Sequence, residues 1–206
     1  MGPLDLSIRS GEILFIVGGN GSGKSTLAML ILGLYRIEEG EIRLNGDLLT
    51  DQIRDEYRQH FSAVLSDFHL FETVSLEENQ QLEMRATDYL KMLGMEEKVK
   101  IESGKFSTLD LSAGQRKRLA LVSAYIEDRP IYLFDEWAAD QDPEFKRLFY
   151  RKVLPELKAV GKAVIVITHD DAYFDCADRL VNLEEGTCIQ WVGPSVSTRS
   201  GARSGA

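Results

Sequence analysis

Several features that would point to other classes of protein are scarce in this sequence. Only 2 of its 206 residues are cysteines. Cys176 and Cys188 stand in no metal-ligand spacing, and a reduced cytosolic protein explains them better than a disulfide framework. The chain also lacks apolar runs of membrane-spanning length and the regions of a secretory signal, so we expect it to be soluble and cytoplasmic.

Positive charge is scarce as well. Lysine and arginine total 24 against 33 aspartates and glutamates, which gives a net charge of −9. A broad basic face for a nucleic-acid backbone is therefore disfavoured, and we expect no nucleic-acid partner. With 44% hydrophobic and 28% charged residues, the composition is that of a globular protein, and the length suits one main domain with a small insertion.

The glycine-rich segment at 18–26 carries the clearest functional signal. It fills the pattern G-x-x-x-x-G-K-[ST] between an apolar run at 13–17 and a helix-like segment at 27–34. Glycines let consecutive N–H groups turn toward phosphates at the positive end of a helix. We predict that Lys24 reaches the β- and γ-phosphates and that Ser25 takes a magnesium position. The expected nucleotide-binding residues are Gly18, Gly19, Asn20, Gly21, Ser22, Gly23, Lys24, Ser25 and Thr26.

Hydrophobic patterns along the chain predict an α/β fold. Alternation at 4–9 predicts a half-buried strand, and residues 41–46 predict a strand that closes with an Asn-Gly hairpin turn, which together suggest an antiparallel layer. Residues 72–110 have charged amphipathic stretches and no strong strand, which indicates a small helical insertion. Further strands are expected at 61–65, 131–136, 163–167, 179–183 and 187–191, and helices at 116–127 and 145–158.

Three further segments carry candidate chemistry. Ser112 and Gly114 precede a helix, where they can cap it or bind an anion, and the residues alone do not decide between these roles. Asp135 and Glu136 end an apolar strand, where carboxylates are costly unless a metal, water or cation engages them; a strand simply leaving the core is the less favoured alternative. His169 also follows a strand, although an isolated histidine there is usually structural or solvated.

The phosphate loop, Leu-Ser-Ala-Gly-Gln at 111–115 and the strand ending in Asp135-Glu136, in this order, resemble the nucleotide-binding domain of ATP-binding cassette (ABC) proteins. The likeness runs from Leu4 to about Trp191. It implies an α/β P-loop ATPase with a RecA-like parallel-sheet core, an antiparallel β layer and a small α-helical subdomain at about 72–113. Residues 1–191 would form the nucleotide-binding domain, and residues 192–206 a flexible tail.

The resemblance also assigns roles at the γ-phosphate. Asp135 would hold Mg²⁺ through water, Glu136 would polarise the water that attacks the γ-phosphate of ATP, and His169 would contact that phosphate. At Ser66 the family usually has glutamine; its hydroxyl or the neighbouring Asp67 could replace that magnesium ligand.

A second copy of the chain completes the family's site. Ser112, Gly114 and Gln115 would face the nucleotide bound to that copy, so that two domains close head to tail around two ATP molecules. Asp142 falls in the loop that links the two sites. The family's adenine-stacking aromatic residue lies on an upstream strand that this chain lacks, and we therefore expect weak ATP binding.

Residues 61–71 and 135–143 narrow the resemblance to the ATPase half of bacterial cyclic-peptide and siderophore exporters, the group of the pyoverdine and syringomycin exporters. These are fusions with a membrane domain, missing here, which would explain the abrupt start. The expected function is ATP-driven export of such a compound, at the cytoplasmic face of the bacterial inner membrane. The alternative is a soluble ABC ATPase in DNA repair or translation, which would need a heptad insertion or a second cassette, and neither is visible. A scaffold without catalysis is disfavoured because the catalytic residues are in place.

Overall fold

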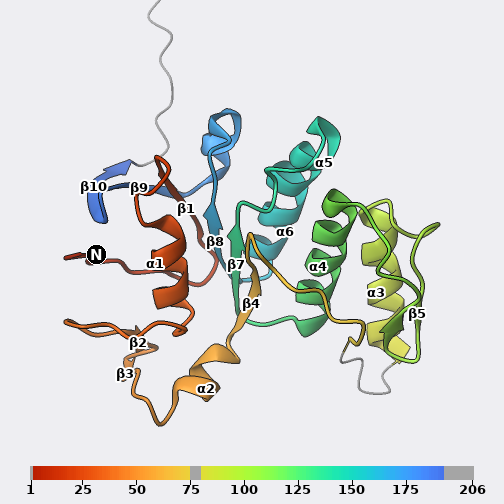
Figure 1. Ribbon diagram of the computed structural model, residues 1–206, viewed down its shortest axis with the longest axis horizontal. Helices are drawn as coiled ribbons and strands as arrows, with labels where there is room; N and C mark the ends of the chain where they lie inside the picture. The colour runs from red at the N-terminus through yellow and green to blue at the C-terminus, as the bar shows by residue number, and fades with distance from the viewer. Residues whose placement is uncertain (1, 75–79, 193–206) are drawn as a thin grey trace, which may run out of the picture.

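A computed structural model describes residues 2–74 and 80–192 (Figure 1). Its centre is a six-stranded sheet with the order β10-β9-β1-β8-β7-β4. The five strands from β9 to β4 run parallel, and β10 is antiparallel to β9. The strands are β1 (Ile13–Gly18), β4 (Phe61–Val64), β7 (Ile131–Asp135), β8 (Ala163–Ile167), β9 (Arg179–Glu184) and β10 (Thr187–Val192). The predicted α/β fold with a parallel core is confirmed.

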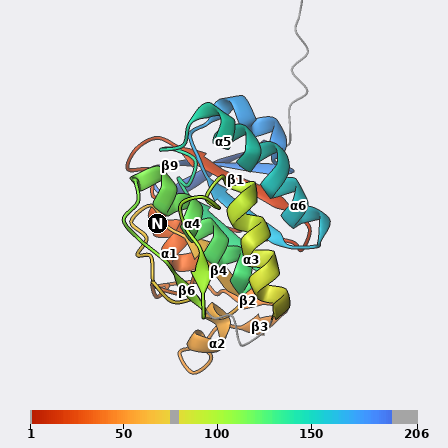
Figure 2. The same ribbon diagram turned by 90° about the vertical axis from the view of Figure 1, so that its right-hand side faces the viewer.

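Helices cover both faces of this sheet, as Figure 1 shows. On one face, Leu14 and Ile16 of β1 pack with Leu27 and Ala28 of α1. On the other face lie α3, α4, α5 and α6, which are turned toward the viewer in Figure 2. Because side chains alternate along a strand, β1 contributes to both layers of the core. The helices are α1 (Lys24–Ile31), α2 (Arg54–Arg58), α3 (Gln80–Met92), α4 (Ala113–Glu127), α5 (Pro143–Leu148) and α6 (Leu154–Ala159).

The strand predicted at 4–9 is wrong, since residues 2–9 have no regular secondary structure. The alternation itself is present: Leu4, Leu6 and Ile8 are half-buried against the α1 side of the core, and the residues between them are exposed. The antiparallel hairpin at Asn45-Gly46 is confirmed, but β2 (Arg43–Leu44) and β3 (Asp47–Leu48) pair only with each other. Alternation reports which face is buried, whereas a strand also needs a neighbour to bond.

The predicted helical insertion contains α3, and Leu90 of this helix packs in the same core cluster as Leu119 and Val122 of α4. A hairpin that the sequence analysis missed follows, formed by β5 (Ile101–Glu102) and β6 (Lys105–Phe106). The predicted helix at 145–158 is interrupted by a π-helical segment, Phe149–Val153, between α5 and α6. A 3₁₀ segment, Asp171–Cys176, leads from β8 to β9.

Parts of two predictions lie outside the described residues, namely the amphipathic stretch at 75–79 and the tail at 193–206. The domain boundaries stay a prediction. Within the part of the chain that is described, none of the helices has the length and apolar content needed to span a bilayer.

Candidate nucleotide-binding and catalytic site

The predicted site residues follow the carboxyl ends of neighbouring parallel strands. In the sheet, Ile16 of β1 pairs with Ile167 of β8, and Ile167 pairs with Asp135 of β7. The phosphate loop follows β1, His169 follows β8, Glu136 follows β7 and Ser66 follows β4. Parallel strands bring these ends to one edge, which is where open α/β sheets hold their ligands. The fold thus assembles four segments that are far apart in the sequence.

The phosphate loop is held close to strand β9. Gly18 has a φ of +148°, and a Cβ at this position would lie 2.3 Å from the carbonyl oxygen of Leu183. By contrast, a Cβ on Gly19 or Gly21 would meet no atom within 4 Å. The outer side of the loop is therefore open, and this space suits phosphate groups.

Lys24 begins helix α1 and is buried against the loop. Its Nζ donates to the carbonyl oxygens of Gly18 and Gly19, each at 2.9 Å. Gly23, with a φ of +99°, precedes the helix without a side-chain cap, so the first N–H groups of α1 stay available to an anion. The hydroxyl of Ser22 is buried and has no hydrogen-bond partner among the described residues. Unpaired buried polar groups are rare, and both observations fit a phosphate site.

Asp135 is almost fully buried at the end of β7, and only one of its carboxylate oxygens is bonded. Oδ2 accepts from the Ser66 hydroxyl at 3.3 Å, while Oδ1 has no partner in the described part of the chain. Burial raises the pKa of Asp135, and the Glu136 charge raises it further. Hydrogen bonds from Ser66 and Ser25 and the charge of Lys24 act in the opposite direction.

These groups fit a magnesium ion. A carboxylate and two hydroxyls are hard oxygen ligands, and Mg²⁺ in nucleotide sites usually takes one or two carboxylates together with phosphate oxygens and water. No cluster of three or more His, Cys, Asp and Glu residues is found among the described residues. Of the two predicted replacements for glutamine, both are exposed, but Ser66 donates to Asp135, and no bond from Asp67 to Asp135 is described.

Glu136 and His169 meet at the same edge. Glu136 Oε1 lies 3.2 Å from His169 Nε2, and both side chains are partly exposed. Glu136 has a φ of +52°, which is uncommon for a residue with a side chain. Its backbone N–H donates to the carbonyl of Ile167 at 3.0 Å. The pair can therefore act together on a phosphate, or on a water molecule, that binds at this edge of the sheet.

The segment at 111–115 caps helix α4. The Ser112 hydroxyl accepts from the N–H of Gln115 at 3.3 Å, and the Gln115 side chain accepts from the N–H of Ser112 at 3.1 Å. The capping role left open by the sequence is thus confirmed. It does not exclude the other role, because a hydroxyl that accepts one bond keeps its own O–H to donate, and Ser112 is exposed. No hydrogen bond or ion pair described in this chain joins the segment to residues 18–26.

Gln141 and Arg118, to which the sequence analysis assigned no role, tie α4 to the loop after β7. The Gln141 side chain donates to the carbonyl of Gly114 at 3.0 Å and accepts from Arg118 at 2.9 Å. Arg118 also pairs with Asp142 at 3.0 Å, and Asp142 caps helix α5. A polar residue on a helix gives no sign of such contacts in the sequence, because they depend on which loop packs beside it.

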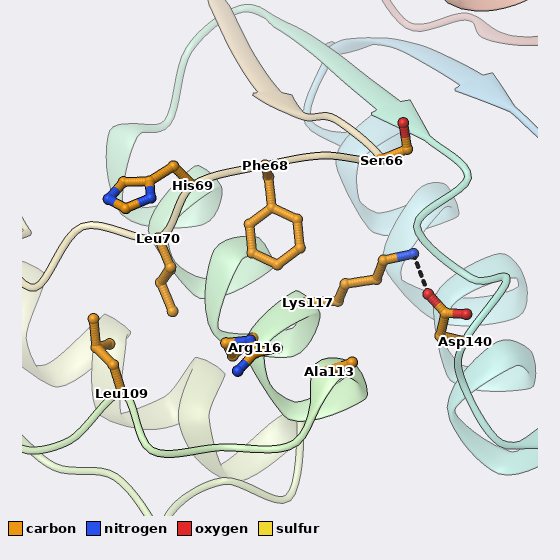
Figure 3. A pocket seen from close by; sticks show the side chains of 9 residues that line it. All are labelled: Ser66, Phe68, His69, Leu70, Leu109, Ala113, Arg116, Lys117 and Asp140. Carbon is orange, nitrogen blue, oxygen red and sulfur yellow. Dashed lines mark ion pairs between the residues drawn. The ribbon is translucent and has the colours of Figure 1, made fainter.

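A groove of about 370 Å³ lies between the segment after β4 and the start of α4 (Figure 3). Figure 3 shows the side chain of Lys117 running toward Asp140, on the side of the groove where Ser66 lies. The lining residues are Ser66, Phe68, His69, Leu70, Leu109, Ala113, Arg116, Lys117 and Asp140.

The fold and the site define a P-loop ATPase domain. The sequence profile described as "ABC transporter" matches residues 1–139, and the chain belongs to the ABC transporter family. It is 57% identical over 192 residues to the ATP-binding protein SyrD of Pseudomonas syringae pv. syringae, an alignment that covers 92% of this chain and 34% of SyrD. It is 32% identical over 204 residues to the glycine betaine transport ATP-binding protein OpuAA of Bacillus subtilis, covering 90% of this chain and 47% of OpuAA. The chain thus spans between a third and a half of the length of these relatives.

Solved structures agree with the family. The ATP-binding subunit of an ABC transporter has a TM-score of 0.77 at 25% identity, covering 91% of this chain and 81% of that one. A dimeric ATP-binding cassette in a post-hydrolysis state, bound to ADP and Pi, has a TM-score of 0.76 at 25% identity, covering 91% and 88%.

Proposed function

We propose that this chain hydrolyses ATP to power the export of a cyclic peptide or siderophore-like compound across the bacterial inner membrane. The observation that carries the catalytic part is the meeting of the phosphate loop, Asp135, Glu136 and His169 at one sheet edge. The exporter part is supported by the 57% identity with SyrD and by the resemblance of residues 61–71 and 135–143 to cyclic-peptide and siderophore exporters. In the full-length transporter the domain would sit at the cytoplasmic face of that membrane.

In the proposed reaction, the phosphate loop binds the nucleotide and Lys24 exchanges its two carbonyl contacts for β- and γ-phosphate oxygens. Mg²⁺, held by Ser25, by Asp135 through water and by Ser66, would neutralise the charge on the phosphate oxygens. Glu136 polarises a water molecule and takes its proton as the water oxygen bonds to the γ-phosphorus. The bond from phosphorus to the bridging oxygen breaks, and ADP and phosphate leave.

We further propose that two copies form the working unit. Ser112, Gly114 and Gln115 would contact the nucleotide of the second copy in a head-to-tail arrangement. Within one chain this segment has no described hydrogen bond or ion pair with its own phosphate loop. Dimeric cassettes among the structural neighbours are consistent with such pairing. Relatives of greater length, such as the macrolide export ATP-binding/permease protein MacB of Bordetella avium, support a membrane domain as the other partner.

The direct test is Glu136→Gln, with the exposed Glu97→Gln as the control for loss of a carboxylate. Glu136→Gln should abolish phosphate release while an ATP-bound dimer accumulates in size-exclusion chromatography, and Glu97→Gln should behave like the parent chain. Unchanged hydrolysis in Glu136→Gln would remove the proposed role of this residue. Nucleic-acid binding with a steep salt dependence would favour the repair or translation alternative instead.

Identifying the transported compound requires the full-length protein. In inverted membrane vesicles, ATP-dependent uptake of a cyclic lipopeptide but not of a siderophore would choose between the two compound classes. Uptake of neither would contradict the exporter proposal without affecting the assignment of the ATPase site.

A further inference from the structure

Lys117, on the first turns of α4, is a buried cation whose described side-chain hydrogen bond and ion pair both reach one loop. Its side chain is only 7% exposed. The Nζ donates to the carbonyl oxygen of Glu136 at 3.0 Å. It also pairs with Asp140 Oδ2 at 2.7 Å, as Figure 3 shows. Its own carbonyl accepts from the indole N–H of Trp137 at 2.7 Å. A buried ammonium is costly unless it is paired and hydrogen-bonded, so the Lys117 side chain depends on its bonds to residues 136–140.

The loop that Lys117 holds begins with a strained residue. The φ of +52° at Glu136 belongs to a region that costs about 1 kcal/mol or more for a residue with a side chain, and such backbone persists where the surroundings determine it. The N–H of Glu136 is fixed by the carbonyl of Ile167. Its carbonyl is fixed by the N–H of Ala139 at 3.2 Å and by the ammonium of Lys117.

The direction of the Glu136 carboxylate follows from this backbone. With both peptide groups held, the side chain leaves the edge of the sheet with Oε1 at 3.2 Å from His169 Nε2. If the carbonyl contact were lost, the peptide could relax toward an ordinary conformation and turn the carboxylate away. Neither the phosphate loop nor α1 contacts Lys117 through any bond described here.

We propose that Lys117 is a positioning residue: by holding the Glu136 carbonyl, it orients the Glu136 carboxylate that acts on the attacking water. This builds on the proposed function, because the orientation matters for turnover only if Glu136 acts on ATP. The lysine acts through the backbone of Glu136 and not on the nucleotide. Its loss should therefore lower kcat and leave nucleotide affinity unchanged.

The chain contains a matched control lysine. Lys162 Nζ donates to the carbonyl oxygen of Asp128 at 2.9 Å and pairs with Asp128 Oδ1, also at 2.9 Å. Asp128, the C-cap of α4, likewise has a positive φ, of +50°. Lys162 thus makes the same kind of contacts with a left-handed residue, but at the opposite end of α4 from Ser112. It is the right comparison for the general cost of removing such a lysine.

The experiment compares Lys117→Met, Lys117→Gln and Lys162→Met in the 206-residue chain. Lys117→Met should lower kcat by about 10- to 100-fold, since a misplacement of about 1 Å can cost this much, while the Kd of a fluorescent ATP analogue stays within about twofold. Lys117→Gln keeps an N–H donor for the Glu136 carbonyl and should recover part of kcat. Lys162→Met should keep both parameters.

Backbone hydrogen exchange gives a readout that does not need turnover. In Lys117→Met, the amides of residues 136–141 should exchange faster than in the parent chain, and in Lys162→Met they should not. Unchanged exchange of these amides in Lys117→Met would overturn the proposal. Equal losses of kcat and nucleotide affinity in both methionine variants would also overturn it. If the parent chain hydrolyses no ATP, the proposed function fails, and hydrogen exchange still decides whether Lys117 holds this loop.

Discussion

Replacing Gly18 by alanine tests how the phosphate loop is fixed to the sheet. The added Cβ would lie 2.3 Å from the Leu183 carbonyl oxygen and 2.7 Å from the Ser22 hydroxyl. Leu183 cannot move aside easily, because it belongs to β9, pairs with Gly18 on one side and with Cys188 of β10 on the other, and is fully buried. The loop must therefore shift away from β9.

The expected cost combines two terms. Overpacking by one methyl group typically costs 1–3 kcal/mol, and a strained φ adds about 1 kcal/mol or more, so we expect about 3 kcal/mol in total for Gly18→Ala. For a chain of this length, about 1 kcal/mol corresponds to roughly 2–4 °C in Tm, which predicts a fall of roughly 6–12 °C. Thermal unfolding followed by circular dichroism at 222 nm measures this. Nucleotide affinity should fall too, because Lys24 is bonded to the Gly18 carbonyl.

Two other glycines separate the steric term from the conformational one. Gly40 has a φ of +90°, and a Cβ at this position would meet no atom within 4 Å, so Gly40→Ala should cost only about 1 kcal/mol. Gly19 has open space and no positive φ, and Gly19→Ala should leave Tm within about 2 °C. A Gly18→Ala chain that melts together with the Gly19→Ala chain would refute the close packing of this loop on β9.

Three further substitutions separate effects on stability from effects on nucleotide binding. Asp135→Asn should stabilise the nucleotide-free chain at pH 7 by about 1 kcal/mol, because burial raises the pKa of Asp135 and its Oδ1 is unpaired among the described residues. The same substitution should weaken Mg²⁺-dependent ATP binding, measured by calorimetry. Ser112→Ala should lower the unfolding free energy by about 1 kcal/mol through loss of the helix cap, and in a Glu136→Gln background it should also abolish the ATP-bound dimer. Ser112→Asp should restore the cap but not the dimer. A dimer restored by Ser112→Asp would contradict the proposed contact with phosphate. Burial raises the pKa of Tyr57 to about 12, so its contribution to stability is complete below pH 10 and is lost as the pH rises through 12. Of the fall in unfolding free energy across this range, roughly 3 kcal/mol should come from Tyr57, and Tyr57→Phe should lack this part.

The sequence was sufficient for the central sheet because its strands carry their signal locally. Residues 131–134 and 163–167 are short apolar runs, which is the pattern expected of strands buried on both faces, and residues 61–65 are mostly apolar. The phosphate loop was equally accessible, since its glycines and Lys24 must occupy fixed spacings to surround a phosphate. The parallel sheet then brings His169 and Glu136 together without further information.

Properties that depend on partners far along the chain were not accessible. Residues 4–9 alternate as a strand should, but the described chain supplies no strand beside them. Lys117 is one of several charged residues on α4, and nothing in its neighbourhood separates a buried lysine from a solvated one. Its role emerges only when β7 brings the Glu136 carbonyl within 3.0 Å.

Helix α4 carries both halves of the proposed reaction. Its N-cap, Ser112, would meet the nucleotide of the second copy. Lys117, little more than one turn further on, is bonded to the carbonyl of Glu136, which would act on the chain's own nucleotide. A rise of about 1.5 Å per residue puts these two positions within about 8 Å along one rigid helix. A shift of that turn on dimer closure would therefore reach the Glu136 carbonyl directly. The same helix that senses the second nucleotide would thus orient the carboxylate for the first, which gives a physical reason for hydrolysis to follow closure.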